Sequence, residues 1–302
     1  MATAATPSGP AVWEHRRVRH LYQCPMRWAD LDLLGHVNNV VYVDYLQEAR
    51  VDMLRVHAPD TRAEDLAEGV VVVRHEVTYL APLTFRFRPV SIECWVTQIR
   101  AASFTMAYEV FDETEDGRRV YARASTVLTP YVFSAERPRR ITSTEREGLA
   151  RFLEPAGPQQ RTEATPVRRS ELGHFPVHVR FSDVDVYGHV NNVKYFEYLQ
   201  EARISMLSRM GRDLSDADPQ RLVVARTDVD YRVPILFREQ PYDSWTWVSH
   251  LGTTSMTFEA VICDRDTTLA RARVVAVSFD ADTQRPTPPA PALREALVAS
   301  MG

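Results

Sequence analysis

The sequence predicts an α+β protein of two tandem domains, each an antiparallel curved sheet wrapped around a central helix. The first observation is a repeat: residues 27–54 and 180–207 share 18 identities in 28 positions at an offset of 153. The second is that each copy joins a polar loop to a helical stripe, and the third is that strand-like segments follow both copies. A match this long at a fixed offset indicates an internal duplication.

Length and composition agree with two globular domains. The chain has 302 residues, 45% of them hydrophobic and 25% charged, which is typical of a protein with a buried core. The longest apolar run, residues 70–73, is far too short to span a membrane, and residues 1–17 lack the pattern of a secretory signal. With a net charge of −4 there is no basic footprint for nucleic acid. We therefore expect neither a membrane nor a nucleic acid as partner.

The three cysteines, Cys24, Cys94 and Cys263, are widely scattered. They are too few for a disulfide scaffold, and no pair has the spacing of metal ligands. We expect buried free thiols in a reducing cytoplasm and no metal site.

The first half of the chain reads as a strand, a helix and four further strands. A loosely alternating segment at 18–28 leads into the repeat, and β-branched or alternating segments follow its helix at 69–80, 90–100, 103–112 and 119–133. Pro82 ends the first of these, and Glu115-Asp116-Gly117 marks a turn between the last two. We expect these strands to form an antiparallel meander.

The second half repeats this outline. Strand-like segments lie at 222–231, 242–250, 254–264 and 269–281, with Tyr231 and Pro234 matching Tyr79 and Pro82. Residues 144–172 hold a short helical pattern at 144–152 and a Pro/Gln/Thr-rich stretch, as in a linker. We divide the chain into a flexible leader (1–12), a first domain (13–143), this linker (144–172), a second domain (173–284) and a Pro-rich tail (285–302) with a short helix at 292–301.

Each repeat is itself divided into a loop and a helix. Residues 30–36 contain two carboxylates and a glycine without helical periodicity, which indicates a loop. Asn38 and Asn39 are good helix caps, and the apolar residues after them form one broad stripe. A helix start carries free N–H groups and partial positive charge, and is therefore suited to bind an oxyanion or a polarised carbonyl.

The pattern D-x-D-x-x-G-H-V-N-N-x-x-Y on a strand, loop and helix, followed by four antiparallel strands, resembles the hotdog-fold acyl-CoA thioesterases of the 4-hydroxybenzoyl-CoA thioesterase type. The resemblance covers nearly all of both halves. It implies two hotdog units side by side in one chain, as an intrachain pseudo-dimer with sites at the interface. It also implies hydrolysis of an acyl-CoA to a free acid and coenzyme A, with no cofactor beyond the coenzyme A of the substrate, and a homo-oligomer of the double-hotdog chain.

The resemblance places the catalytic carboxylate on the second acid of D-x-D, which is Asp32 in one repeat and Asp185 in the other. It acts as a general base or as a nucleophile. The first acids, Asp30 and Asp183, are expected to hold the loop. We predict that the thioester is bound near the helix starts and by one strand serine in each half; these residues are His36, Val37, Asn38, Asn39 and Ser103 in the first half and His189, Val190, Asn191, Asn192 and Ser255 in the second.

Several of these roles have alternatives. The histidines either orient the carboxylate and its water or pack the loop. The asparagines either cap the helix or bond the carbonyl, whose oxygen we expect to bind backbone N–H groups near 37–40 and 190–193. Glu48 and Glu201 are expected to form structural ion pairs with Arg50 and Arg203. Further arginines are available for the phosphates of coenzyme A: Arg86, Arg88, Arg123, Arg271 and Arg273.

Two other functions fit the same pattern. A hotdog hydratase or dehydratase also uses an Asp/His pair after a strand, although the sequence after His36 is a poorer match to that class. A non-catalytic module that binds acyl-CoA is the second alternative, against which both second aspartates argue. Assays for thiol release, for enoyl-CoA hydration and for binding without turnover distinguish the three.

Overall fold

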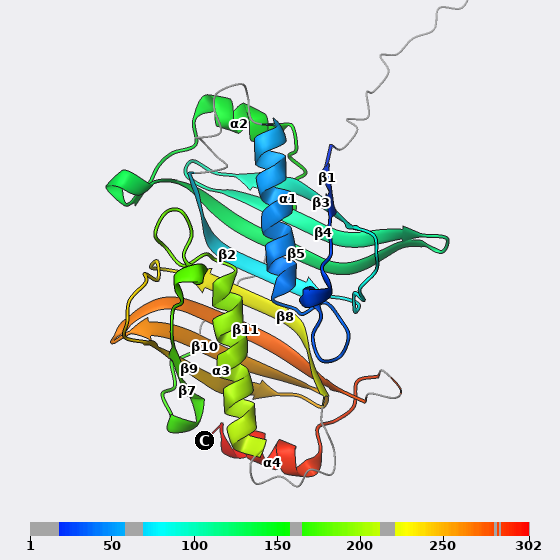
Figure 1. The fold of residues 1–302 in the computed structure, drawn as a ribbon, viewed down its shortest axis with the longest axis vertical. Coiled ribbons are helices and arrows are strands. Elements are labelled where there is room, and N and C mark those ends of the chain that lie inside the picture. The colour runs from blue at the N-terminus through cyan, green and yellow to red at the C-terminus, as the bar shows by residue number, and fades with distance from the viewer. Residues whose placement is uncertain are drawn as a thin grey trace, which may run out of the picture.

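The computed structural model of the protein describes residues 18–57, 69–157, 165–211, 221–280, 283 and 285–301. Two long helices lie on the same face of one broad antiparallel sheet (Figure 1). The predicted leader, residues 1–12, lies outside the described residues. The elements of the first half are β1 (His20–Cys24), α1 (Val41–His57), β2 (Val70–Tyr79), β3 (Val90–Ile99), β4 (Phe104–Thr114), β5 (Gly117–Val132), β6 (Arg137–Pro138) and α2 (Ser143–Ala150). Those of the second half are β7 (His174–Val177), α3 (Lys194–Gly211), β8 (Arg221–Tyr231), β9 (Tyr242–Leu251), β10 (Ser255–Asp264), β11 (Thr267–Phe279) and α4 (Pro291–Ala299).

The strand order is β1-β3-β4-β5-β2-β8-β11-β10-β9-β7, and the second half mirrors the first about the β2–β8 pair. Strands β3, β4 and β5 form the expected meander, but the expectation is wrong for β2, which lies beyond β5 and not beside β3. Its other edge pairs with β8. An unpaired edge strand exposes a row of backbone hydrogen-bonding groups, and the pairing of β2 with its counterpart satisfies them.

The ends of several elements have local causes. β1 is shorter than the expected 18–28 because Pro25, which has no N–H, follows Cys24. α2 begins with a capping box in which the Thr142 hydroxyl accepts from the Glu145 N–H. It lies within the stretch predicted as linker and packs on β3 through Leu149, which is buried. In the predicted tail, α4 packs on α3.

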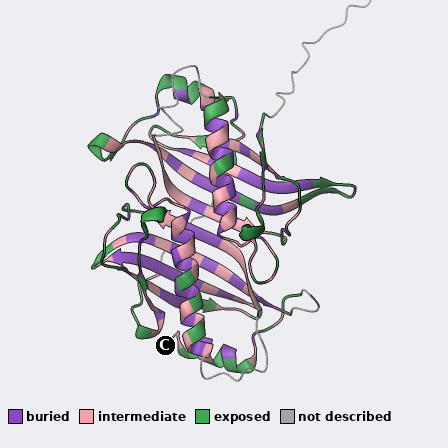
Figure 2. Cartoon of the chain, viewed as in Figure 1, coloured by how far each residue is buried: buried purple, intermediate pink, exposed green. Residues whose placement is uncertain are grey.

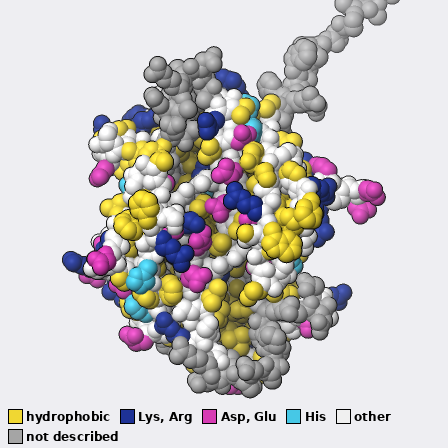
Figure 3. Space-filling view, in the orientation of Figure 1, with side chains coloured by type: hydrophobic (Ala, Val, Ile, Leu, Met, Phe, Trp, Pro, Cys, Tyr) yellow, Lys and Arg dark blue, Asp and Glu magenta, His cyan; other side chains and the backbone are white. Residues whose placement is uncertain are grey.

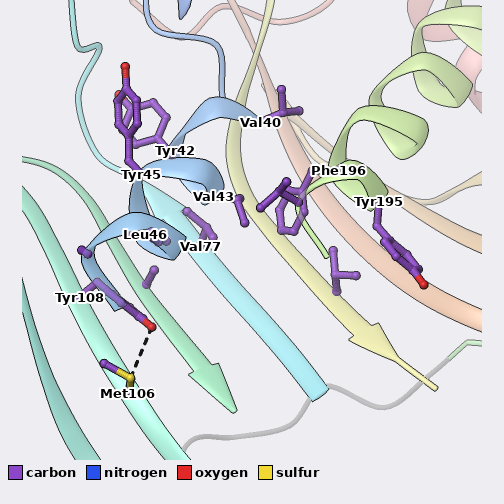
Figure 4. Packing of buried hydrophobic residues seen from close by; sticks show 14 of the residues in the cluster. Val40, Tyr42, Val43, Tyr45, Leu46, Val77, Met106, Tyr108, Tyr195 and Phe196 are labelled. Atoms are coloured by element: carbon purple, nitrogen blue, oxygen red, sulfur yellow. Dashed lines mark hydrogen bonds between the residues drawn. The ribbon is translucent and has the colours of Figure 1, made fainter. Parts of the chain in front are cut away.

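The core lies between the helices and the sheet. The predicted stripe of α1 is buried, with Leu46 and Ala49 fully covered, while only Glu48, Arg55 and Val56 of this helix are exposed (Figure 2). One cluster of buried residues contains side chains from both halves, including Val43 and Val77 on one side and Phe196 on the other (Figure 4). The two hotdog units therefore share a continuous hydrophobic core.

The seam between the units is a pair of antiparallel strands with approximate twofold symmetry. Glu76 of β2 pairs with Asp228 of β8, its own counterpart in the repeat. On one face of the seam, Arg74 contacts Glu76 (2.7 Å) and Asp230 (2.6 Å), and Arg226 contacts Glu76 (3.3 Å) and Asp228 (2.9 Å). Opposite charges thus cross the seam in both directions, which favours this register.

His75 lies at the same seam on the helix side and is fully buried. The Asn192 side-chain amide donates to Gln47 (3.1 Å) and to Asn191 (3.1 Å), so Asn192 Oδ1 is left to accept from His75 Nε2–H at 3.1 Å. Nδ1 of His75 then accepts from the Thr126 hydroxyl at 2.8 Å. Burial, and to a lesser extent the positive charge of Arg50, lowers the pKa of His75 from 6.5 to about 3.

This depressed pKa predicts acid sensitivity at the seam. Below pH 6.5 the unfolded chain protonates this histidine while the folded chain keeps it neutral, so stability present above pH 6.5 is lost as the pH falls towards 3. In urea titrations, the advantage of wild type over His75→Gln should shrink on acidification by up to about 1.4 kcal/mol per pH unit. His178→Gln, at an exposed position, should run parallel to wild type. Equal slopes for all three proteins contradict the assignment.

Candidate active site

The second aspartate of each repeat forms a tight turn. The Asp185 N–H donates to the His189 carbonyl (2.8 Å), and the Gly188 N–H donates to the Asp185 carbonyl (3.1 Å). Asp185 Oδ1 accepts from the Tyr187 N–H at 2.9 Å, while Oδ2 has no hydrogen-bond partner among the described residues. Asp32 is held in the same way, its Oδ1 accepting from backbone N–H groups of its own turn. Each turn fixes one carboxylate oxygen and leaves the other available.

The first aspartate of each repeat holds the loop through two bonds to one carboxylate oxygen. Asp30 Oδ2 accepts from the Arg27 N–H (2.7 Å) and from the Tyr45 hydroxyl (2.5 Å). Asp183 makes the equivalent bonds to the Arg180 N–H (2.9 Å) and the Tyr198 hydroxyl (2.6 Å). The two acids of D-x-D thus have different surroundings: the first is bonded to a tyrosine hydroxyl as well as to the backbone, whereas the second accepts only from backbone N–H groups of its own turn.

The N–H groups at the helix starts are less available than the sequence predicts. The Val190 N–H donates to the Ile235 carbonyl (2.8 Å), and the Asn191 N–H donates to the Asp183 carbonyl (2.8 Å). Val37 and Asn38 are bonded in the same way in the first repeat. These amides are used to dock the loop, so the expectation that they bind the carbonyl is wrong.

One predicted position remains available. In the part of the chain that the structure describes, the backbone N–H of Asn192 has no acceptor. The preceding asparagine caps α3, because Asn191 Oδ1 accepts from the Val193 N–H at 3.2 Å. Asn38 makes the equivalent bond in the first repeat at 3.3 Å. The two asparagines of the pair therefore have different roles: the side chain of the first caps the helix, and the backbone N–H of the second is an unbonded donor at the helix start.

A cavity of about 590 Å³ lies at the interface between the halves, with Asp185 in its wall. The second half contributes the predicted loop and helix start, including Asp185, His189, Val190, Asn191 and Asn192. The first half contributes the side of α1 together with the start of β2 and the end of β5. Those residues, with Pro138 of β6, are Gln47, Arg50, Val51, Leu54, Val70, Val71, Val72, Val73, Thr129, Tyr131 and Phe133. The catalytic candidate thus faces a wall made by the other half.

Sequence reasoning missed the contribution of α1. Gln47 is not among the predicted site residues, and Arg50 is predicted only as the partner of Glu48 in an ion pair. In the structure Gln47 bonds Asn192 across the seam and Arg50 is 6% exposed. The sequence did contain a sign that this side of the helix has a role, because both repeats keep the identical segment Y-L-Q-E-A-R. The expected ion pair of Arg50 with Glu48 is wrong, since Glu48 is exposed and no ion pair joins these two described residues.

An aromatic stack closes one side of the cavity. Phe133, just after β5, stacks on Tyr187 with ring centroids 3.7 Å apart and an interplanar angle of 2°. Its ring also lies 5.9 Å from that of His189. Tyr187 follows the Asp185 turn, and its counterpart in the first repeat is Leu34. This contact between the halves is therefore specific to one repeat.

The remaining candidates lie elsewhere. Ser103 and Ser255 lie in the β3–β4 and β9–β10 hairpins and are not among the described residues that line this cavity. Most arginines suggested for coenzyme A phosphates contact carboxylates on the sheet. These contacts join Arg86 to Asp112, Arg123 to Glu109, and Arg271 and Arg273 to Glu259. On the surface seen from the helix side, acidic and basic side chains are likewise interspersed (Figure 3).

Metal ligands, membrane helices and reactive thiols are three further features that a site could use. Within the described ranges, no three His, Cys, Asp or Glu side chains are grouped so that they could hold a metal ion. The described helices include none that combines the length and apolar character needed to cross a bilayer. Cys24, Cys94 and Cys263 are free and buried, and burial raises the pKa of the Cys24 and Cys94 thiols to about 12. These two thiols are therefore poor nucleophiles.

Comparisons with known proteins give a consistent picture. The profile of the thioesterase-like superfamily matches residues 26–152 and 179–297, which is most of the chain. Over 84 residues the chain is 36% identical to the uncharacterized protein YsmA of Bacillus subtilis, a match that covers 27% of this chain and 54% of that relative. The chain thus spans about half the length of this relative.

Solved structures share the double architecture. A protein from Lactobacillus plantarum assigned as an oleoyl thioesterase superposes with a TM-score of 0.70 at 16% identity, covering 89% of this chain and 97% of that one. The 12:0-ACP thioesterase from Umbellularia californica superposes with a TM-score of 0.67 at 16% identity, covering 87% and 94%. At this identity the likeness establishes the fold.

The turn that carries Asp185 predicts a stability effect. Gly188 has φ +81°, and no atom lies within 4 Å of the position that a Cβ would take, so Gly188→Ala should cost about 1 kcal/mol through backbone strain alone. Gly148→Ala in α2 has equal space and should instead stabilise by up to about 1 kcal/mol through helix propensity. Urea unfolding of both variants measures the difference. A neutral or stabilising Gly188→Ala contradicts the strain.

Proposed function

The chain belongs to the thioesterase-like superfamily, and on that premise we propose that it hydrolyses acyl-CoA thioesters in the cavity between its two halves. The observation that carries the proposal is the Asp185 carboxylate, which has one oxygen fixed by its own turn and the other free in the wall of that cavity. Asp32 is held by the same turn in the first repeat, and we propose a second site there.

Hydrolysis needs a nucleophile and a donor for the charge that develops on the carbonyl oxygen. Asp185 takes a proton from water, whose oxygen attacks the thioester carbonyl; alternatively, the carboxylate attacks first and water cleaves the resulting anhydride. The backbone N–H of Asn192, at the positive end of α3, stabilises the oxyanion. The C–S bond then breaks, the thiolate is protonated, and the products are a free acid and coenzyme A.

The surroundings of Asn192 keep this donor in place. The Tyr231 hydroxyl donates to the Asn192 carbonyl at 3.0 Å, and the side chain bonds Gln47 and His75 of the first half. His189 lies in the same wall, 5.9 Å from the ring of Phe133, where it packs the loop and can contact the water. Residues from both halves therefore hold the catalytic loop, which favours a site that works only when the halves are joined.

The similar structures suggest a second candidate for the carrier of the acyl group. A structural neighbour is named as a 12:0-ACP thioesterase, so an acyl carrier protein is the alternative leaving group. Matched acyl-CoA and acyl-carrier substrates, with free thiol as readout, distinguish the two. We further propose that the enzyme acts in the cytoplasm as a homo-oligomer of the double-hotdog chain.

Replacement of the second aspartates tests the proposal. Because each carboxylate serves its own site, Asp32→Asn and Asp185→Asn should each abolish turnover at one site and leave the rate at the other site unchanged. The double variant should lose activity by about 100-fold or more, the usual contribution of a general base. The measurement is thiol release from aryl-, short-, medium- and long-chain acyl-CoAs.

Asp266→Asn is the matched control, because this side chain is 96% exposed on the β10–β11 turn and should leave turnover unchanged. Full activity in the folded double variant contradicts the proposed role. The single variants also test whether the sites differ, since Leu34 and Val41 in one repeat are replaced by Tyr187 and Lys194 in the other. Identical substrate profiles for the two single variants contradict such a difference.

A further inference from the structure

The cavity of Asp185 also contains a buried positive charge. Arg50 of α1 lines this cavity and is 6% exposed. Its Nη1 is buried without a hydrogen-bond partner in the part of the chain that the structure describes, and no described carboxylate forms an ion pair with it. A buried charge without a counter-charge is strongly unfavourable, so its presence in a ligand cavity needs an explanation.

The guanidinium lies among buried side chains on the helix side of the sheet. Burial raises the pKa of Tyr108 and of Tyr231, and the positive charge of Arg50 partly offsets the rise in both. The same charge helps to lower the pKa of His75. Tyr108 and His75 are 1% and 0% exposed, so their shared neighbour is beneath α1 and away from the protein surface.

Several arginines that are more exposed than Arg50 are paired with carboxylates. Arg226, with a side chain 42% exposed, contacts Asp228 at 2.9 Å, and Arg118, 34% exposed, contacts Glu93 at 2.9 Å. The second repeat keeps an arginine at the counterpart of Arg50. Arg203 is 8% exposed, and burial lowers its pKa to about 10. A buried arginine is therefore a feature of both copies of the helix.

The surroundings of Arg50 indicate what it binds. The part of the cavity wall that the first half makes includes apolar side chains, namely Val51, Leu54 and the valines of residues 70–73, while Asp185 and the helix start lie in the wall of the other half. A thioester whose carbonyl is at Asp185 therefore extends its acyl group along apolar side chains towards a cation. A guanidinium presents paired N–H donors that match the two oxygens of a carboxylate.

We propose that Arg50 binds a carboxylate on the acyl group, so that the preferred substrates are thioesters of dicarboxylic acids. The proposal rests on the proposed function and names its substrate class. A phosphate of coenzyme A has similar chemistry, but it belongs to the carrier and would meet arginines at the surface. The depth of Arg50 favours the acyl group.

The test compares thioesters matched in chain length, one ending in a carboxylate and one in a methyl group. Wild type should have a kcat/KM about 10- to 100-fold higher for the carboxylate, the range expected for a hydrogen bond to a charged group. Arg50→Met should remove most of this ratio, and Arg50→Lys should keep part of it. Arg55→Met, at an exposed position on the same helix, should match wild type.

Pantetheine thioesters of the same two acids separate the sources of the anion, because they lack the nucleotide phosphates. The preference should persist in them. If Arg50→Met instead slows both coenzyme A thioesters alike and neither pantetheine thioester, Arg50 binds phosphate and the proposal is overturned. The melting temperature of Arg50→Met should be unchanged or higher, because a buried charge without a counter-charge is removed. A lower melting temperature with equal losses on both substrates indicates a structural role and also overturns the proposal.

Binding of non-hydrolysable thioethers makes this test independent of turnover. The carboxylate thioether should stabilise wild type more than the methyl thioether in thermal shift, and Arg50→Met should remove the difference. If no thioester is hydrolysed, the proposed function fails, while a retained difference in binding still supports the role of Arg50. Equal stabilisation by both thioethers overturns that role even if thioesters are hydrolysed.

Discussion

The pairing of β2 with β8 is the constraint on which the rest of the structure depends. Each half alone would expose one strand edge and the apolar residues beside it, including Val77 and Val229, both of which are fully buried. Joining the edges extends the sheet and merges the two cores. It also positions the loop of the second half, because Asn192 at the end of that loop bonds Gln47 on the helix of the first half. The seam is therefore a condition for the site as well as for stability.

Hydrogen bonding within the loop determines which groups remain free for chemistry. The first aspartate, the amides that follow the histidine and the first asparagine are all used to hold the loop or cap the helix. Asp185 and Asn192 line the cavity, and one oxygen of Asp185 and the backbone N–H of Asn192 stay outside these bonds among the described residues. A loop that satisfies nearly all its polar groups can hold two unsatisfied ones in fixed positions, as preorganised catalysis requires.

The sequence predicted the features that depend on local residues and missed those that depend on pairing between the halves. The D-x-D turn, the capping asparagine and the buried stripe of α1 were readable because each involves neighbours along one segment. Gln47 and Arg50 were not, because a second side of α1 is buried only where the other half covers it. The position of β2 was missed for the same reason, since its partner strand belongs to the other half of the chain. The occupied amides of Val37 and Val190 were missed because their acceptors lie on a later segment.

A duplication within one chain also permits the two sites to differ in sequence, which two identical subunits cannot do. In a symmetric dimer, any substitution at the interface appears in both sites. Here His75 bonds Asn192 while its counterpart is Thr227, and Tyr187 stacks on Phe133 while its counterpart is Leu34. The backbone pairing has stayed symmetric, as the register of Glu76 with Asp228 shows, while the side chains around the two D-x-D loops have diverged. Covalent linkage thus keeps the halves in register and allows each site to acquire its own lining.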